Sequence, residues 1–160
     1  MAEQQNKTVL TEEGLKKLEA QLDYLVSVRR NEVSEQIAIA RGFGDLSENA
    51  EYDEAKKEQA KVEEEIVRLT NTIRTAVVVA DSEISTEKVS VGTSVRVKDV
   101  DTGDEDVYAI VGAEESDPYE NKISNESPVG AGLLGAKRGD VVSIEIPAGI
   151  LRYEILDITR

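Results

Sequence analysis

The apolar positions in the first half of the chain recur at helical spacing. An earlier stretch of them is interrupted near Arg29 and Arg30, and comprises Leu15, Leu18, Leu22, Leu25, Val33, Ile37 and Ala40. A later stretch advances by alternating steps of three and four, which is the heptad pattern of a coiled-coil seam with one polar member. It comprises Tyr52, Ala55, Gln59, Val62, Ile66, Leu69, Ile73 and Ala76. The two stretches predict two long helices that pack along one seam.

A short turn with two glycines, Gly42 and Gly44, separates the two helical stretches. Thr11, followed by two glutamates, is a suitable start for the first helix. Two helices joined by a short connection run antiparallel, and about 30 residues each would reach roughly 45 Å. We therefore expect residues 1–80 to form a coiled-coil helical hairpin with an exposed acidic tip at residues 41–48.

Beyond Val79 the period changes from helical to strand-like. Alternation predicts strands at about 95–100, 107–111, 142–146 and 150–158, the last two forming a hairpin around a Pro-Ala-Gly turn. Ser127 and Pro128 are typical of a helix cap and a first helical position, so a short helix is expected over about 129–136. The fold class is therefore α+β, with residues 81–160 forming a small globular α+β domain.

Composition restricts the chemistry that the chain can support. It has no Cys and no His, which excludes disulfides, thiolate zinc sites and catalysis by an imidazole base. A net charge of −14 disfavours binding to free duplex DNA. The N-terminus lacks the pattern of a signal peptide, and no apolar run is long enough to span a membrane. We therefore expect a cytoplasmic protein without a membrane partner.

The predicted tip carries two carboxylates, Asp45 and Glu48, three residues apart at the start of the second helix. At this spacing both side chains can point the same way, and the helix dipole favours their ionised form. Carboxylate oxygens are hard ligands that suit Mg²⁺. A structural interpretation also fits, because Asp-x-x-Glu before a helix resembles a capping box. The residues alone leave both interpretations open.

The segment Gly44–Tyr52, GDLSENAEY, resembles the tip signature of GreA-type transcript-cleavage factors. Further segments resemble the same family, from the Leu-Thr-Glu-Glu-Gly at Leu10–Gly14 to the last strand. These are Ile123-Ser124, Ser127-Pro128-Val129-Gly130, Leu133-Leu134-Gly135, Gly139-Asp140 and Pro147-Ala148-Gly149. The resemblance therefore covers nearly the whole chain.

This resemblance implies an accessory factor that is inert alone and acts, as a monomer, on RNA polymerase. The hairpin would enter the secondary channel of the polymerase and stimulate cleavage near the 3′ end of backtracked RNA. Asp45 and Glu48 would be the catalytic pair and would hold a Mg²⁺ ion jointly with the polymerase. The second half would resemble an FKBP-like domain and dock at the channel rim through the region of Ser124, Ser127, Pro128 and Gly130.

Other tip residues have two interpretations each. Leu46 packs on the loop or touches the polymerase, Asn49 bonds within the tip or positions RNA, and Ser47 lies between the acids. Phe43 is expected to cover the end of the seam rather than contact the channel. Arg41, Lys56 and Lys57, near the tip, either meet RNA phosphate or form a solvated helix face. Arg29 and Arg30, in the middle of the hairpin, either contact the transcript or simply mark the break in the seam.

Three rival functions remain. A Gre-like inhibitor would occupy the same channel without cleavage, and relatives of that kind carry a more acidic tip. Prolyl isomerase activity would need an aromatic-lined pocket, yet the only aromatics beyond residue 80 are Tyr108, Tyr119 and Tyr153. A plain coiled-coil adaptor would tolerate loss of the tip acids.

Overall fold

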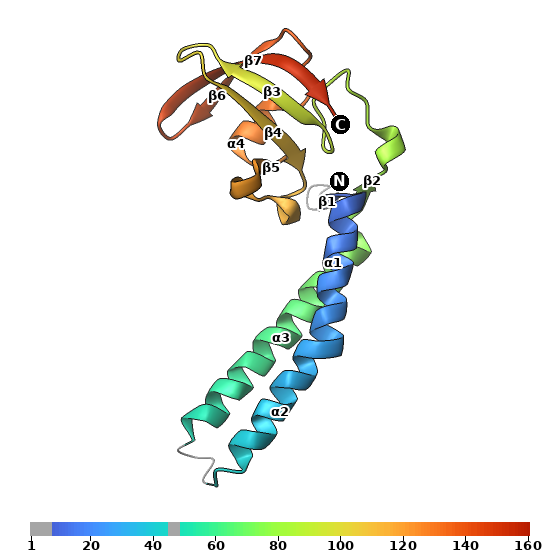
Figure 1. Ribbon diagram of the computed structural model, residues 1–160, viewed down its shortest axis with the longest axis vertical. Helices are drawn as coiled ribbons and strands as arrows, with labels where there is room; N and C mark the ends of the chain where they lie inside the picture. The colour runs from blue at the N-terminus through green and yellow to red at the C-terminus, as the bar shows by residue number, and fades with distance from the viewer. Residues whose placement is uncertain (1–7, 45–48) are drawn as a thin grey trace, which may run out of the picture. The chain divides into compact units, whose positions relative to one another are not determined.

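The computed structural model describes residues 8–44 and 49–160. Contacts divide the chain into two compact units, residues 16–75 and residues 1–15 together with 76–160 (Figure 1). This division differs from a single boundary near residue 80, because a short strand before the helical hairpin pairs with a short strand after it. The strands are β1, Val9–Thr11, and β2, Val77–Val79, and they run parallel.

The helical unit is the antiparallel hairpin that the seam predicts. Its first arm comprises α1 (Glu12–Tyr24), a π-helical segment η2 (Leu25–Arg29) and α2 (Arg30–Arg41), and its second arm is α3 (Ala50–Thr75). In Figure 1, α2 and α3 lie side by side. The buried seam residues between the arms confirm the predicted pattern, and they are Val33, Ile37, Ala55, Val62 and Ile66, with Leu22, Leu25 and Tyr52 packed against them.

The π-helical segment lies where the seam of the first arm is interrupted. Leu25 and Val33 are eight residues apart, one more than a heptad. An α-helix would therefore carry Val33 about 100° away from the seam. In the π turn the Arg30 N–H donates to the Leu25 carbonyl, five residues back, and this wider turn takes up one extra residue. Both parts of the arm thus keep their apolar faces toward α3.

The second unit contains a five-stranded sheet with the order β5-β4-β3-β7-β6. The strands are β3 (Ser94–Asp99), β4 (Glu105–Val111), β5 (Lys122–Ser124), β6 (Val141–Ile146) and β7 (Gly149–Thr159). β6 and β7 form the predicted hairpin. β5 was not predicted, and it pairs parallel to β4 over three residues. Three short 3₁₀ turns complete the unit: η3 (Asp81–Glu83), η4 (Ala113–Glu115) and η5 (Pro118–Glu120).

The short helix α4, Pro128–Leu133, packs against the sheet and completes its core. It begins at the predicted cap but ends before the predicted residue 136. At Gly132 an added Cβ would lie 2.6 Å from the side chain of Ile144, so the helix approaches β6 closely. Leu133 of α4 joins Val95, Val97, Ile110 and Ile155 in the core. The α+β fold class is confirmed.

The start of the first helix is fixed by a carboxylate distant in sequence. The Glu115 carboxylate accepts a hydrogen bond from the Thr11 N–H at 3.0 Å and a second, very short one from the Thr11 hydroxyl. It also accepts from the Gly112 N–H at 3.3 Å. The Thr11 hydroxyl in turn accepts from the Gly14 N–H at 3.0 Å. A Cβ at Gly14 would lie 2.1 Å from the Glu115 side chain, so only glycine leaves room for this arrangement.

We predict that Glu115→Gln weakens this junction by about 1–3 kcal/mol, because an amide supplies one acceptor oxygen in place of two. Amide hydrogen exchange should show faster exchange at Thr11 and Gly112. Glu126→Gln, a change at an exposed glutamate, is the matched control. Unchanged protection of the Thr11 amide in Glu115→Gln would contradict this assignment.

The π segment leads to a deletion test. Removing Val28, which is exposed, should convert the π turn into regular α-helix and keep Val33 on the seam. We expect an unfolding free energy within about 1 kcal/mol of the parent, as no apolar surface is lost. Removing the exposed Glu35 should instead cost more than about 3 kcal/mol, because Ile37 and Ala40 would rotate away from the seam. Urea unfolding followed by circular dichroism compares the two, and equal losses would refute the interpretation.

Candidate functional site

The end of the hairpin is described on both sides of the predicted acidic pair. α2 ends at Arg41, and the Gly42 N–H donates to the Ile39 carbonyl at 3.0 Å. Gly44 then has a φ of 100°, a backbone conformation that favours glycine. The glycine turn is therefore confirmed. Asp45, Leu46, Ser47 and Glu48 lie outside the described residues, and their predicted roles remain predictions.

Asn49, the first described residue after the tip segment, links the two helices. Its side-chain Nδ2 donates to the Ala40 carbonyl at 2.6 Å, and its Oδ1 accepts from the Tyr52 N–H at 3.1 Å. The second contact is that of an N-cap residue on α3. The first adds a donor to a carbonyl at the end of α2 that also accepts from the Phe43 N–H at 3.2 Å. Asn49 therefore supports the tip, as one of its two predicted roles required.

One flank of the hairpin near this end carries cations and an aromatic ring. The Arg41 guanidinium lies 6.0 Å from the Tyr52 ring centroid, within the range of a cation–π contact. One to two turns along α3, the Lys56 ammonium donates to Gln59 at 3.2 Å. Farther along the same flank, Arg30 donates twice to Glu63, at 2.8 and 2.9 Å. We call Arg30, Arg41, Tyr52, Lys56, Gln59 and Glu63 the cationic flank.

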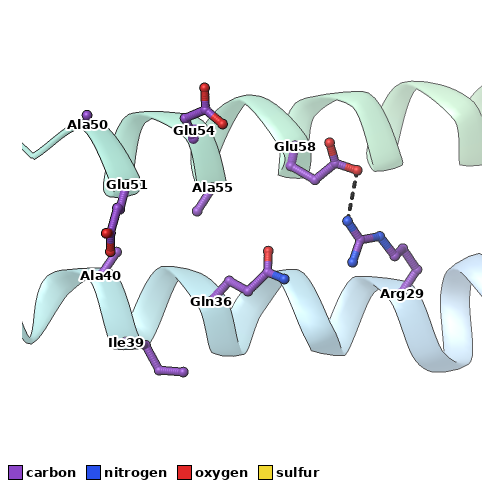
Figure 2. A pocket seen from close by; sticks show the side chains of 9 residues that line it. All are labelled: Arg29, Gln36, Ile39, Ala40, Ala50, Glu51, Glu54, Ala55 and Glu58. Carbon is purple, nitrogen blue, oxygen red and sulfur yellow. Dashed lines mark hydrogen bonds and ion pairs between the residues drawn. The ribbon is translucent and has the colours of Figure 1, made fainter.

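The other flank contains a groove of about 640 Å³ between α2 and α3 (Figure 2). Arg29 bonds to Glu58 at 3.0 Å at one end of it. In Figure 2, Gln36 and Glu51 point toward the opposite helix, whereas Ile39 and Glu54 lie toward the outside. The lining residues form what we call the acidic groove: Arg29, Gln36, Ile39, Ala40, Ala50, Glu51, Glu54, Ala55 and Glu58.

The ion pairs modify the expectations for the mid-hairpin cations. Arg29 and Arg30 each bond to a carboxylate of α3, so they bridge the two arms. Hydrogen bonds from Arg30 hold the pKa of the Glu63 carboxyl below its ordinary value. The bond to Glu58 likewise raises the pKa of Arg29 above its ordinary value. Phe43 does not cover the seam as expected, since 65% of it is exposed.

The four predicted docking residues lie in one hydrogen-bonded turn. The Ser127 hydroxyl donates to the Ser124 carbonyl at 2.6 Å and accepts from the Gly130 N–H at 3.1 Å, which caps α4. Pro128 follows as the first helical residue and is exposed. A Cβ at Gly130 would lie 1.9 Å from the Ser124 carbonyl oxygen. Ser127 and Gly130 therefore have a structural role, whether or not this turn binds a partner. Pro128 is exposed and accessible to a partner.

The aromatics of the second unit do not line a common pocket. Tyr108 and Tyr153 pack edge to face within the core, with ring centroids 6.4 Å apart, and burial raises the pKa of Tyr108 above its ordinary value. Tyr119 is 99% exposed. A prolyl isomerase pocket built on these three rings is therefore not supported.

Within the described residues 8–44 and 49–160, no three acidic, His or Cys side chains gather in a metal-binding group. Nor do those ranges contain a helix that is both long and apolar enough for a membrane span.

Comparison with known proteins decides the family. A family model described as transcription elongation factor, GreA/GreB, C-term, matches residues 84–160, and one described as transcription elongation factor, N-terminal, matches residues 8–78. The chain is 55% identical to transcription elongation factor GreA of Clostridium perfringens, over 98% of this chain and 99% of that relative. The chain belongs to the GreA/GreB family of transcription elongation factors.

Another relative matches over nearly the whole chain. GreA of Clostridium botulinum is 53% identical over 96% of both chains. Gfh1, GreA factor homolog 1 of Thermus thermophilus, is 27% identical, covers 97% of this chain and 100% of its own, and superposes with a TM-score of 0.44. The resemblance on which the sequence analysis relied is confirmed, as is the function of a transcription elongation factor.

Sequence reasoning missed several residues that the structure shows in contacts or in the acidic groove. Glu115 was not singled out, although it bonds to Thr11 of the Leu-Thr-Glu-Glu-Gly segment that carried part of the resemblance. Glu51, Glu54 and Glu58 also escaped notice. Their spacing of three and four residues placed them on one face of α3, and this was the signal that could have found them.

We predict that Asn49→Ala destabilises the hairpin by about 1–2 kcal/mol, because α3 loses its cap and the link to Ala40 disappears. Asn49→Asp keeps the cap oxygen and loses only the donor to Ala40, so it should fall between Asn49→Ala and the parent. Thermal unfolding followed by circular dichroism ranks the three proteins. Equal stability of Asn49→Asp and Asn49→Ala would contradict a capping role.

Proposed function

We propose that this chain inserts its helical hairpin into the secondary channel of RNA polymerase and stimulates hydrolysis of backtracked RNA near the 3′ end. The observation that carries the proposal is the closure of the hairpin by Asn49, which directly follows the tip segment in the sequence. Asn49 caps α3 at Tyr52, so this cap does not require Asp45 or Glu48. We assign those two acids to chemistry at the tip.

The two helix ends beside the tip segment are held together. The bond from Asn49 to the Ala40 carbonyl links them, and the buried residues Ala40 and Ala55 continue the seam close to the tip. Precise placement of reacting groups contributes strongly to catalysis, so linked helix ends on both sides of the tip segment support delivery of its acids to another active site.

The donor set suits a shared magnesium ion. Two carboxylates are too few to enclose Mg²⁺ alone, but Mg²⁺ commonly binds one or two carboxylates together with phosphate oxygens and water. Asp45 and Glu48 would hold the ion jointly with the polymerase. When bound, the ion supplies charge neutralisation and activation of water at the phosphodiester. The chain has neither His nor Cys, so it cannot supply an imidazole or thiolate group to activate the water instead.

The cationic flank adds a site for RNA phosphate. Arg41 lies over the Tyr52 ring, which orients its side chain near the tip without neutralising its charge. Lys56 is also exposed, and it donates a hydrogen bond to the neutral Gln59. We infer that these two cations bind the displaced RNA strand, in contrast to Arg29 and Arg30, which pair with carboxylates.

The second unit would dock on the channel rim through the turn around Pro128 and Ser124. The factor would act as a cytoplasmic monomer and would be inert without the polymerase, which supplies the catalytic centre.

The decisive prediction concerns the tip acids. Asp45→Ala or Glu48→Ala should reduce cleavage of backtracked RNA by about 100-fold or more, because a ligand to the shared ion is lost. Polymerase binding should stay within a few fold. The assay follows the shortening of labelled RNA in a stalled polymerase complex. The control is Asp53→Ala, which removes an exposed carboxylate in the first turn of α3, close to the tip.

Three other outcomes would reject the proposal. A fall in melting temperature with unchanged cleavage per bound factor would assign the acids to capping. Blocked synthesis by the parent protein without RNA shortening would make it a channel inhibitor. Full activity after loss of both acids would leave only an adaptor role.

A further inference from the structure

The acidic groove is not used by the chemistry at the tip. It lies on the flank opposite Arg41 and Lys56, because Arg29 pairs with Glu58 on this side and Arg30 with Glu63 on the other. Glu58 and Glu63 are five residues apart on α3, so they project about 140° from each other around the helix. The hairpin therefore offers two chemically different flanks.

Small side chains leave the space for the groove. Ala40 and Ala55 form its buried floor and Ala50 lies at its tip end. Ile39 forms an apolar edge that is 57% exposed. An exposed isoleucine beside an open groove of about 640 Å³ leaves apolar surface that a partner could bury.

Charge decides which partner fits. The groove presents the carboxylates of Glu51, Glu54 and Glu58 against one guanidinium, that of Arg29, which is already bonded to Glu58. This excess of negative charge repels RNA phosphate. A second copy of this chain, with a net charge of −14, is disfavoured for the same reason. An Arg or Lys side chain matches both features, because its stem is apolar and its end is cationic.

We propose that the acidic groove binds a basic polypeptide segment of RNA polymerase, whose Arg or Lys side chains lie along Ile39 and the alanines and meet Glu51 and Glu54. This inference rests on the proposed insertion into the polymerase channel. It gives each flank a partner: the cationic flank faces RNA, and the acidic groove faces protein. The groove thereby sets the rotation of the hairpin within the channel.

The test compares affinities for core polymerase without RNA. Glu51→Gln/Glu54→Gln should bind roughly tenfold more weakly and with a smaller dependence on salt, because two charge contacts are lost. Ile39→Ala should also weaken binding, but with the salt dependence of the parent. Asp53→Asn, a neutralisation in the same turn of α3 outside the groove, should bind within twofold.

The occupant is identified by crosslinking. Since the chain has no cysteine, Gln36→Cys introduces a unique thiol at the groove for a photoactivatable label. Mass spectrometry should recover a polymerase peptide that contains Arg or Lys, whereas the same label at Glu64→Cys, an exposed α3 position outside the groove, should not recover that peptide.

The outcomes separate the two proposals. If the parent protein fails to bind polymerase, channel insertion and the groove are both rejected. If the parent and the double variant bind equally well, the groove alone is rejected and the hairpin function stands. Crosslinks to RNA in a backtracked complex, or to a second copy of this chain, would also reject the assignment of a basic protein segment.

Discussion

The constraint on which the hairpin depends is that its apolar seam must face α3 over the whole length of the first arm. Neither arm can bury this face alone, since most helical stability in proteins comes from packing of an apolar face. The sequence contains one residue too many for a continuous heptad between Leu25 and Val33. The π turn removes the mismatch without exposing Val33 or Ile37, which are 1% and 6% exposed.

This local solution also determines where charges lie. At the end of the π turn, the consecutive residues Arg29 and Arg30 reach two different sides of α3, one at Glu58 and the other at Glu63. The ion pairs are partly exposed, so each adds little to stability. Their larger effect is on the distribution of charge along the hairpin. Arg29 and Arg30 are paired with carboxylates, which leaves Arg41 and Lys56 as the cations nearest the tip. The electrostatic difference between the flanks thus begins with the seam.

Periodicity predicted the elements whose burial pattern extends over several turns or strand residues. The seam and the β6–β7 hairpin follow from such patterns, whereas the helix start near Glu12 and the turn at Ser127 follow from their capping residues. Strands β1, β2 and β5 have only three residues each, too few to show an alternation. The hydrogen bonds between Glu115 and Thr11 join positions 104 residues apart, so no local sequence pattern could reveal them. Sequence also marked the seam break correctly, but the wider turn that resolves it depends on packing against α3.

The same reasoning separates two kinds of residue within the family signatures. Gly14, Ser127 and Gly130 belong to matching segments, yet each has a contact that explains its identity by the fold alone: space beside Glu115, the cap of α4, and close approach to Ser124. In the tip signature, Asn49 is explained in this way too. Asp45 and Glu48 lie outside the described residues, and Asn49 supplies the cap at Tyr52 without them. Their proposed role at an ion shared with the polymerase therefore rests on the family signature and not on a contact within the fold.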